Sequence, residues 1–111
     1  MKTAPNNHSA RRYERVTVDI SVRIVKDAIV TSGRAHDLSG TGMSIYSPAE
    51  FAIGEVIRTE FTLPNSRMKL ELAAAVKNRI GFRYGLEFQK LDKAQTAEIV
   101  RVTGILALTQ T

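Results

Sequence analysis

The most constraining feature of this sequence is an alternation of apolar and polar side chains from Val16 to Ile24. Valine or isoleucine occupies every second position, and threonine, aspartate, serine and arginine stand between them. A period of two places all the apolar side chains on one face of a β-strand, so the segment predicts a strand with one buried face. The rest of the chain must supply strands that cover this face.

Five further segments have the character of strands. They are separated by turn residues such as Lys26-Asp27, Gly54 and Pro64-Asn65-Ser66. The segments are Ala28–Leu38, Gly42–Tyr46, Val56–Leu63, Met68–Ile80 and Arg83–Gln89. Because no helical pattern lies between them, they favour an antiparallel barrel or a compact sandwich. Of the two we expect a small, mostly β, six-stranded barrel over about residues 16–89.

The two ends of the chain differ from this pattern. Asp92 and Gln95 have the spacing of a capping box, and Ile99, Val102 and Leu106 then recur at helical spacing. We expect a C-terminal α-helix over about residues 92–108 that packs on or beside the barrel. Residues 1–10 are polar and lack any periodicity, so they predict a flexible N-terminal arm before a single domain at 11–108.

Composition excludes several classes of protein. A chain of 111 residues is the size of one domain. It has no cysteine and only two histidines, so we expect no disulfide, no thiolate zinc site and no metal. No apolar run is long enough to span a bilayer and the first residues lack a signal-peptide core, so we expect a cytoplasmic protein without a membrane span.

Basic residues are in excess and are clustered. Sixteen Lys and Arg against eleven Asp and Glu give a net charge of +5, which favours anionic partners. Arg11, Arg12 and Arg15 lie close together just before the first strand. Guanidinium groups bind phosphates and guanine edges in bidentate fashion, although a solvated basic start to the fold would have the same sequence.

A second polar cluster, Asp37-Leu38-Ser39-Gly40-Thr41-Gly42, lies between the second and third predicted strands. If the strand continues through them, Asp37 and Ser39 point to the same side, and the glycines allow a tight turn. A carboxylate and a hydroxyl together suit the donor-rich edge of guanine. The alternative is a polar turn in which both side chains cap their own backbone.

A hydrolytic triad of His36, Asp37 and Ser39 is disfavoured, because neighbouring strand residues face opposite sides and His36 should diverge from Asp37. The sequence also lacks a phosphate-binding Gly-Lys loop and a dinucleotide fingerprint. We therefore expect no enzymatic activity.

Two motifs together resemble the PilZ domain family of bacterial cyclic di-GMP receptors. One is Arg-x-x-x-Arg at Arg11 and Arg15, and the other is Asp-x-Ser-x-x-Gly at Asp37, Ser39 and Gly42. They stand in the family's order, and the segment from Tyr84 to Phe88 is similar to its closing strand. The resemblance covers about residues 11–108.

The resemblance implies a PilZ-type barrel that binds cyclic di-GMP without a cofactor or catalysis. Arg11 and Arg15 would hold phosphate and guanine, with Arg12 as a further candidate. Asp37 and Ser39 would bond a guanine edge, and Gly42 would shape the turn. Ordering of the arm by the ligand would relay the signal to an unidentified downstream protein partner.

Two other functions fit the same sequence less well. The first is a PilZ-fold adaptor that does not bind nucleotide, which the intact motifs disfavour. The second is a small basic barrel that binds single-stranded nucleic acid. Such barrels stack bases on aromatic side chains, and this chain has four Phe, three Tyr and no Trp, so we expect no nucleic-acid partner.

Overall fold

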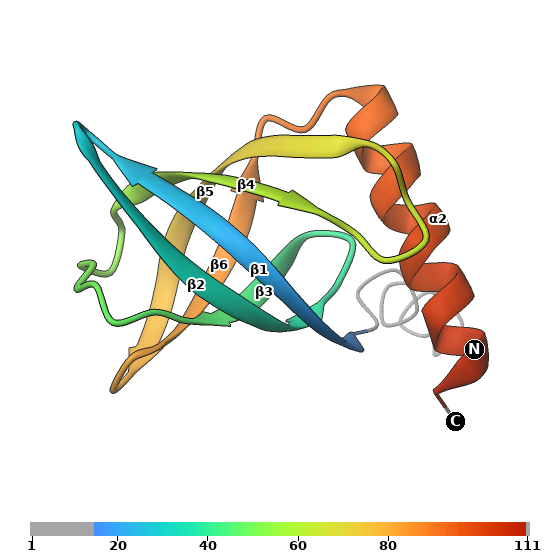
Figure 1. The fold of residues 1–111 in the computed structure, drawn as a ribbon, viewed down its shortest axis with the longest axis horizontal. Helices are drawn as coiled ribbons and strands as arrows, with labels where there is room; N and C mark the ends of the chain where they lie inside the picture. The colour runs from blue at the N-terminus through green and yellow to red at the C-terminus, as the bar shows by residue number, and fades with distance from the viewer. Residues whose placement is uncertain (1–14, 111) are drawn as a thin grey trace, which may run out of the picture.

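The computed structural model describes residues 15–110, which form six strands followed by one helix (Figure 1). The elements are β1 (Val16–Lys26), β2 (Ile29–Leu38), β3 (Gly42–Tyr46), β4 (Val56–Thr62), β5 (Lys69–Ile80), β6 (Arg83–Gln89) and α2 (Lys93–Thr109). Every expected strand and the expected helix are confirmed, with ends close to those predicted. The arm predicted for residues 1–10 lies outside the described residues.

The strands form a closed antiparallel barrel in the order β1-β2-β3-β6-β5-β4. The closure between β1 and β4 is short, because only residues 23–25 pair with residues 58–60. Strands β2 and β3 are joined by a tight turn, and Val16 at the start of β1 pairs with Leu38 at the end of β2, so the start of β1 lies next to this turn. A barrel leaves few free strand edges, which explains how a small chain can consist mainly of β-structure.

The barrel interior is filled by the alternating apolar residues. Val16, Val18, Val22 and Ile24 of β1 are all buried, as the period of two predicts. Among residues 15–110, Tyr84 of β6 is the largest fully buried side chain. Its phenol donates a hydrogen bond to the carbonyl of Ala49 (2.9 Å) and accepts one from the amide of Phe51 (3.2 Å), so the long connection between β3 and β4 is fixed to the core.

Helix α2 lies beside one end of the barrel (Figure 1), where Ile99 and Val102 are buried against it. Asp92 and Gln95 form the predicted capping box. After the last turn, the Gln110 amide accepts a hydrogen bond from the Thr17 amide (2.7 Å) and donates one to the Thr17 carbonyl (2.8 Å). Within residues 15–110, no helix is both long and apolar enough to cross a membrane.

A polar cluster fastens the helix to the turn between β4 and β5. Arg101 donates to both carboxylate oxygens of Glu98 (3.0 and 2.7 Å) and to the carbonyl of Asn65 (2.9 Å), and the Ser66 hydroxyl also donates to Glu98. The hydrogen bonds from Arg101 and Ser66 lower the pKa of the Glu98 carboxyl to about 2.

This shift predicts a specific acid sensitivity. Because the folded-state pKa of Glu98 lies below its ordinary value of 4.5, its stabilisation is present above that pH and is lost as the pH falls toward 2. We expect Glu98→Gln to flatten the fall in melting temperature between about pH 4.5 and 2. Glu50→Gln, at an exposed position, is the control and should follow the wild type. Equal slopes for Glu98→Gln and wild type would contradict this role.

Candidate ligand-binding site

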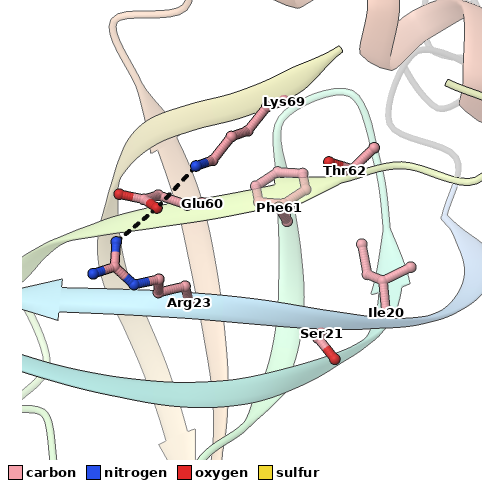
Figure 2. A pocket seen from close by; sticks show the side chains of 7 residues that line it. All are labelled: Ile20, Ser21, Arg23, Glu60, Phe61, Thr62 and Lys69. Carbon is pink, nitrogen blue, oxygen red and sulfur yellow. Dashed lines mark hydrogen bonds and ion pairs between the residues drawn. The ribbon is translucent and has the colours of Figure 1, made fainter. Parts of the chain in front are cut away.

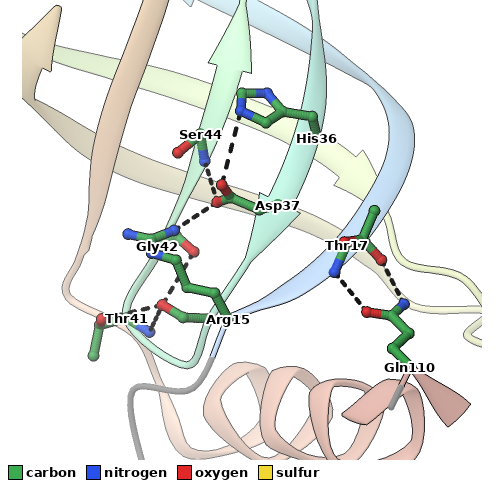
Figure 3. A network of polar contacts seen from close by, with 9 residues as sticks. Arg15, Thr17, His36, Asp37, Thr41, Gly42, Ser44 and Gln110 are labelled. Carbon is green, nitrogen blue, oxygen red and sulfur yellow. Dashed lines mark hydrogen bonds and ion pairs between the residues drawn. The ribbon is translucent and has the colours of Figure 1, made fainter. Parts of the chain in front are cut away.

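The candidate site lies where the start of β1 meets the corner between β2 and β3 (Figure 3). Arg15 Nη1 donates to Asp37 Oδ1 at 2.6 Å, and the amide of Ser44 donates to the same oxygen at 3.2 Å. The Asp37 side chain is 20% exposed and that of Arg15 is 51% exposed. The structure therefore brings one arginine of the first motif onto the aspartate of the second, while Arg11 and Arg12 lie outside the described residues.

Ser39 has a different environment from Asp37. Strand β2 ends at Leu38, as predicted, so it does not continue through Ser39 and the condition for Asp37 and Ser39 to share a face is not met; Ser39 is only 2% exposed. Its hydroxyl accepts a hydrogen bond from the amide of Thr41 (3.2 Å), and its own amide donates to the carbonyl of Gly42 (2.8 Å). In this structure Ser39 shapes the turn through its own backbone contacts.

Gly42 is required by close packing between strands. It lies opposite Glu87 in the β3–β6 pairing, and a Cβ at this position would lie 2.1 Å from the backbone oxygen of Leu86. No side chain fits there without separating the two strands. The glycine of the second motif thus holds the turn against β6, where the amide of Phe88 also donates to the Thr41 carbonyl (2.8 Å).

The expected divergence of His36 and Asp37 is wrong. His36 Nε2 lies 3.7 Å from Asp37 Oδ2, so both side chains are on the outer face. The cause is a β-bulge: Ala35 pairs with Ile45 and Asp37 with Ser44, which leaves His36 as an extra residue in β2. The conclusion against a triad stands on other grounds, because the described contacts of the Ser39 hydroxyl are with Thr41 and Gly42.

Sequence reasoning missed two residues beside Asp37. Ser44 supplies the backbone amide that holds the carboxylate, and no side-chain pattern marks such a role. Tyr46 is 52% exposed on the outer face of β3, and its ring lies 4.7 Å from that of His36 with an angle of 34° between the planes. Its position in an alternating strand after buried Ile45 could have indicated that it faces outward.

A separate hollow lies between β1 and β4 (Figure 2). Its charged residues contact one another: Arg23 Nη1 and Lys69 Nζ lie 2.9 and 3.6 Å from the same Glu60 oxygen, and the Arg23 hydrogen bond lowers the pKa of the Glu60 carboxyl. None of the residues predicted from the sequence to bind a ligand lines this hollow. We therefore place the candidate site at Arg15 and Asp37.

The fold and the site together define a class: a closed six-stranded barrel with a C-terminal helix and an arginine bonded to the aspartate of an Asp-x-Ser-x-x-Gly corner. The family description PilZ domain matches residues 9–104. The chain belongs to the PilZ domain family.

Solved structures agree with this assignment. The PilZ domain of YcgR from Escherichia coli, solved with c-di-GMP, is 19% identical with a TM-score of 0.70, over 89% of this chain and 92% of that one. The PilZ domain of CeSA from a cellulose-synthesizing bacterium is 21% identical with a TM-score of 0.64, over 83% and 97%. The inhibitor of motility MotI/DgrA from Bacillus subtilis is 17% identical with a TM-score of 0.79, over 89% and 52%. No curated sequence matches the chain significantly.

Proposed function

We propose that this protein is a receptor for cyclic di-GMP. The observation that carries the proposal is the convergence of Arg15 and Asp37, which come from separate motifs and lie 2.6 Å apart at one corner of the barrel. The E. coli YcgR domain of the same fold was solved with this nucleotide, which supports the choice of ligand. The adaptor function without nucleotide has no comparable feature in its favour.

The chemistry of the two side chains suits the two parts of the ligand. Arg15 donates one hydrogen bond, from Nη1, to Asp37. Its guanidinium is half-exposed, and its remaining N–H groups suit a phosphate or the O6 and N7 atoms of guanine. Asp37 Oδ1 is occupied by Arg15 and Ser44, while Oδ2 accepts no hydrogen bond from residues 15–110. In our proposal Oδ2 accepts from the N1–H or N2–H₂ group of guanine.

The remaining motif residues complete the proposed site. Arg11 and Arg12 would add phosphate contacts from the segment before β1. Ser39 and Gly42 would contribute by holding the corner in shape, and Ser39 is also our candidate for a contact with the guanine edge. We propose no catalytic step and no cofactor.

The proposed relay to a protein partner has a physical route. Thr17 follows Arg15 by two residues, and both of its backbone groups are bonded to Gln110 at the end of α2. A ligand that repositions Arg15 would therefore act close to the hydrogen bonds that join β1 to the C-terminal end of the helix. We propose that ordering of the arm by the ligand relays the signal to a downstream protein, and that α2 takes part through its contact with β1.

The direct test is calorimetric titration with cyclic di-GMP, with cyclic di-AMP and GTP as controls. Binding of cyclic di-GMP that is clearly tighter than binding of both controls supports the receptor function. Equal heats for all three, or no heat with cyclic di-GMP, would contradict it and leave the adaptor function as the better explanation.

Guanine selectivity should depend on Asp37. We expect Asp37→Ala to weaken cyclic di-GMP binding by about 1.5–3 kcal/mol, the worth of a hydrogen bond to a charged group. The affinity for cyclic di-AMP should fall much less, because adenine lacks the N1–H and N2–H₂ donors from which the carboxylate accepts hydrogen bonds. The ratio of the two dissociation constants measures the effect.

Asp19→Ala is a matched control, since Asp19 is bonded to Arg34 at 2.6 Å and lies on the outer face of β1. That variant should leave the ratio unchanged. If Asp37→Ala lowered both affinities equally, the role of the carboxylate in reading guanine would be refuted.

A further inference from the structure

The outer face of the barrel next to Asp37 carries an aromatic pair that the proposed contacts do not use. Tyr46 lies on β3 two positions after Ser44, and Ser44 is the register partner of Asp37. Residues two apart in a strand share a face and are separated by roughly 7 Å. The Tyr46 side chain therefore leaves the outer face of β3 roughly 7 Å along the strand from Ser44, the partner of Asp37.

His36 packs against this tyrosine. The two rings lie 4.7 Å apart, and the bulge in β2 is what turns the imidazole toward the outer face. Neither imidazole nitrogen has a hydrogen-bond partner among residues 15–110, and the polar group given nearest to the ring is Asp37 Oδ2, 3.7 Å from Nε2. Tyr46 is nevertheless 52% exposed, which leaves a large part of its surface uncovered.

Phe82 is the other exposed aromatic side chain in the described part of the chain, and its partner is a cation instead of a second ring. Phe82 is 53% exposed, and the Arg79 guanidinium lies 5.9 Å from its ring centroid. The register neighbours of Tyr46 on the outer face are Arg83 and Arg34, of which Arg34 is paired with Asp19, so a guanidinium group lies on each side of Tyr46 in the sheet. A partly open aromatic ring among arginines suits a base that carries a phosphate.

We infer that Tyr46, backed by His36, is the stacking surface for a purine of the bound nucleotide. This inference rests on the proposed function and extends it: Asp37 bonds the edge of the base, and Tyr46 packs against its face. Stacking is tolerant of base identity because every purine has a π-face. Tyr46 thus supplies affinity, whereas Asp37 supplies the preference for guanine.

The test is titration of cyclic di-GMP into the wild type, Tyr46→Leu, Tyr46→Phe and Phe82→Leu. We expect Tyr46→Leu to weaken binding roughly 10-fold or more, the usual loss when a stacked aromatic is removed. The loss should be similar at low and high salt, because stacking is not screened as ion pairs are. Tyr46→Phe and Phe82→Leu should bind as the wild type does.

The outcomes separate this inference from the receptor proposal. A wild type that does not bind would overturn both. If the wild type binds and Tyr46→Leu binds equally well, the stacking role alone is overturned. The same holds if Phe82→Leu loses as much affinity for cyclic di-GMP as Tyr46→Leu does. Thermal unfolding checks that Tyr46→Leu is folded. As a measurement without any substitution, the NMR ring signals of Tyr46 should shift when cyclic di-GMP is added, and unmoved signals would also overturn the inference.

Discussion

Replacing Gly42 by alanine is expected to lower the free energy of unfolding by about 3 kcal/mol, near the upper end of the usual cost of overpacking. The new Cβ would lie 2.1 Å from the backbone oxygen of Leu86, and a strand backbone cannot yield as a flexible side chain can. The pairing of β3 with β6 would have to open at the corner that holds Asp37. Urea unfolding followed by circular dichroism measures the loss.

Gly104→Ala is the matched control for this prediction. Gly104 lies inside α2, and a Cβ there would meet nothing within 4 Å. Alanine should stabilise the helix by about 0.5–1 kcal/mol, since glycine is a poor helix former. The same substitution should thus have opposite signs at the two positions. If Gly42→Ala unfolded at the wild-type urea concentration, close strand packing could not be the reason for glycine at this position.

Replacing Arg15 by alanine is expected to weaken cyclic di-GMP binding by about 1.5–3 kcal/mol, or roughly 10- to 150-fold, with the fold intact. The guanidinium is half-exposed, so its removal leaves no cavity, but it takes away a charge-assisted contact to the ligand and the partner that positions Asp37. The loss should shrink at high salt, because the phosphate component of the contact is screened. Calorimetry at two salt concentrations gives both quantities.

Arg23→Ala provides the comparison. Arg23 is as exposed as Arg15 and is bonded to Glu60 at 2.9 Å, but it lies at the hollow between β1 and β4. Both variants lose one positive charge, so a general electrostatic attraction would weaken equally in the two. Equal affinities for Arg15→Ala and Arg23→Ala would contradict a specific role for Arg15.

The strands were predictable because burial on one side of a barrel imposes a period of two on the sequence. The alternation in β1 and β5 is nearly unbroken, and the capping box at Asp92 marks the start of α2. These signals are local. They depend on side chains within one element, and tertiary contacts reinforced them.

The candidate site was predictable only in part. The resemblance implied a site shared by Arg15 and Asp37, and in the structure their side chains lie 2.6 Å apart, whereas their role in binding a ligand stays a prediction. The outward direction of His36 was not predictable, because a bulge depends on how two strands pair and leaves no mark in the periodicity of one strand. Likewise, the motif makes Ser39 and Gly42 candidates for the ligand site. Their contacts with the backbone of the turn and of β6 could not be predicted, because these contacts depend on how the turn packs.

The double hydrogen bond between Gln110 and Thr17 joins positions 93 residues apart in sequence. Because of this contact, the start of β1 and the end of α2 lie side by side although they are at opposite ends of the described chain. This proximity suits circular permutation. A permutant would link residue 110 to the start of β1 and place its new ends in the exposed Asp27-Ala28 turn. It would keep every strand pairing. The fold thus offers a scaffold whose termini can be moved to the end of the barrel away from α2.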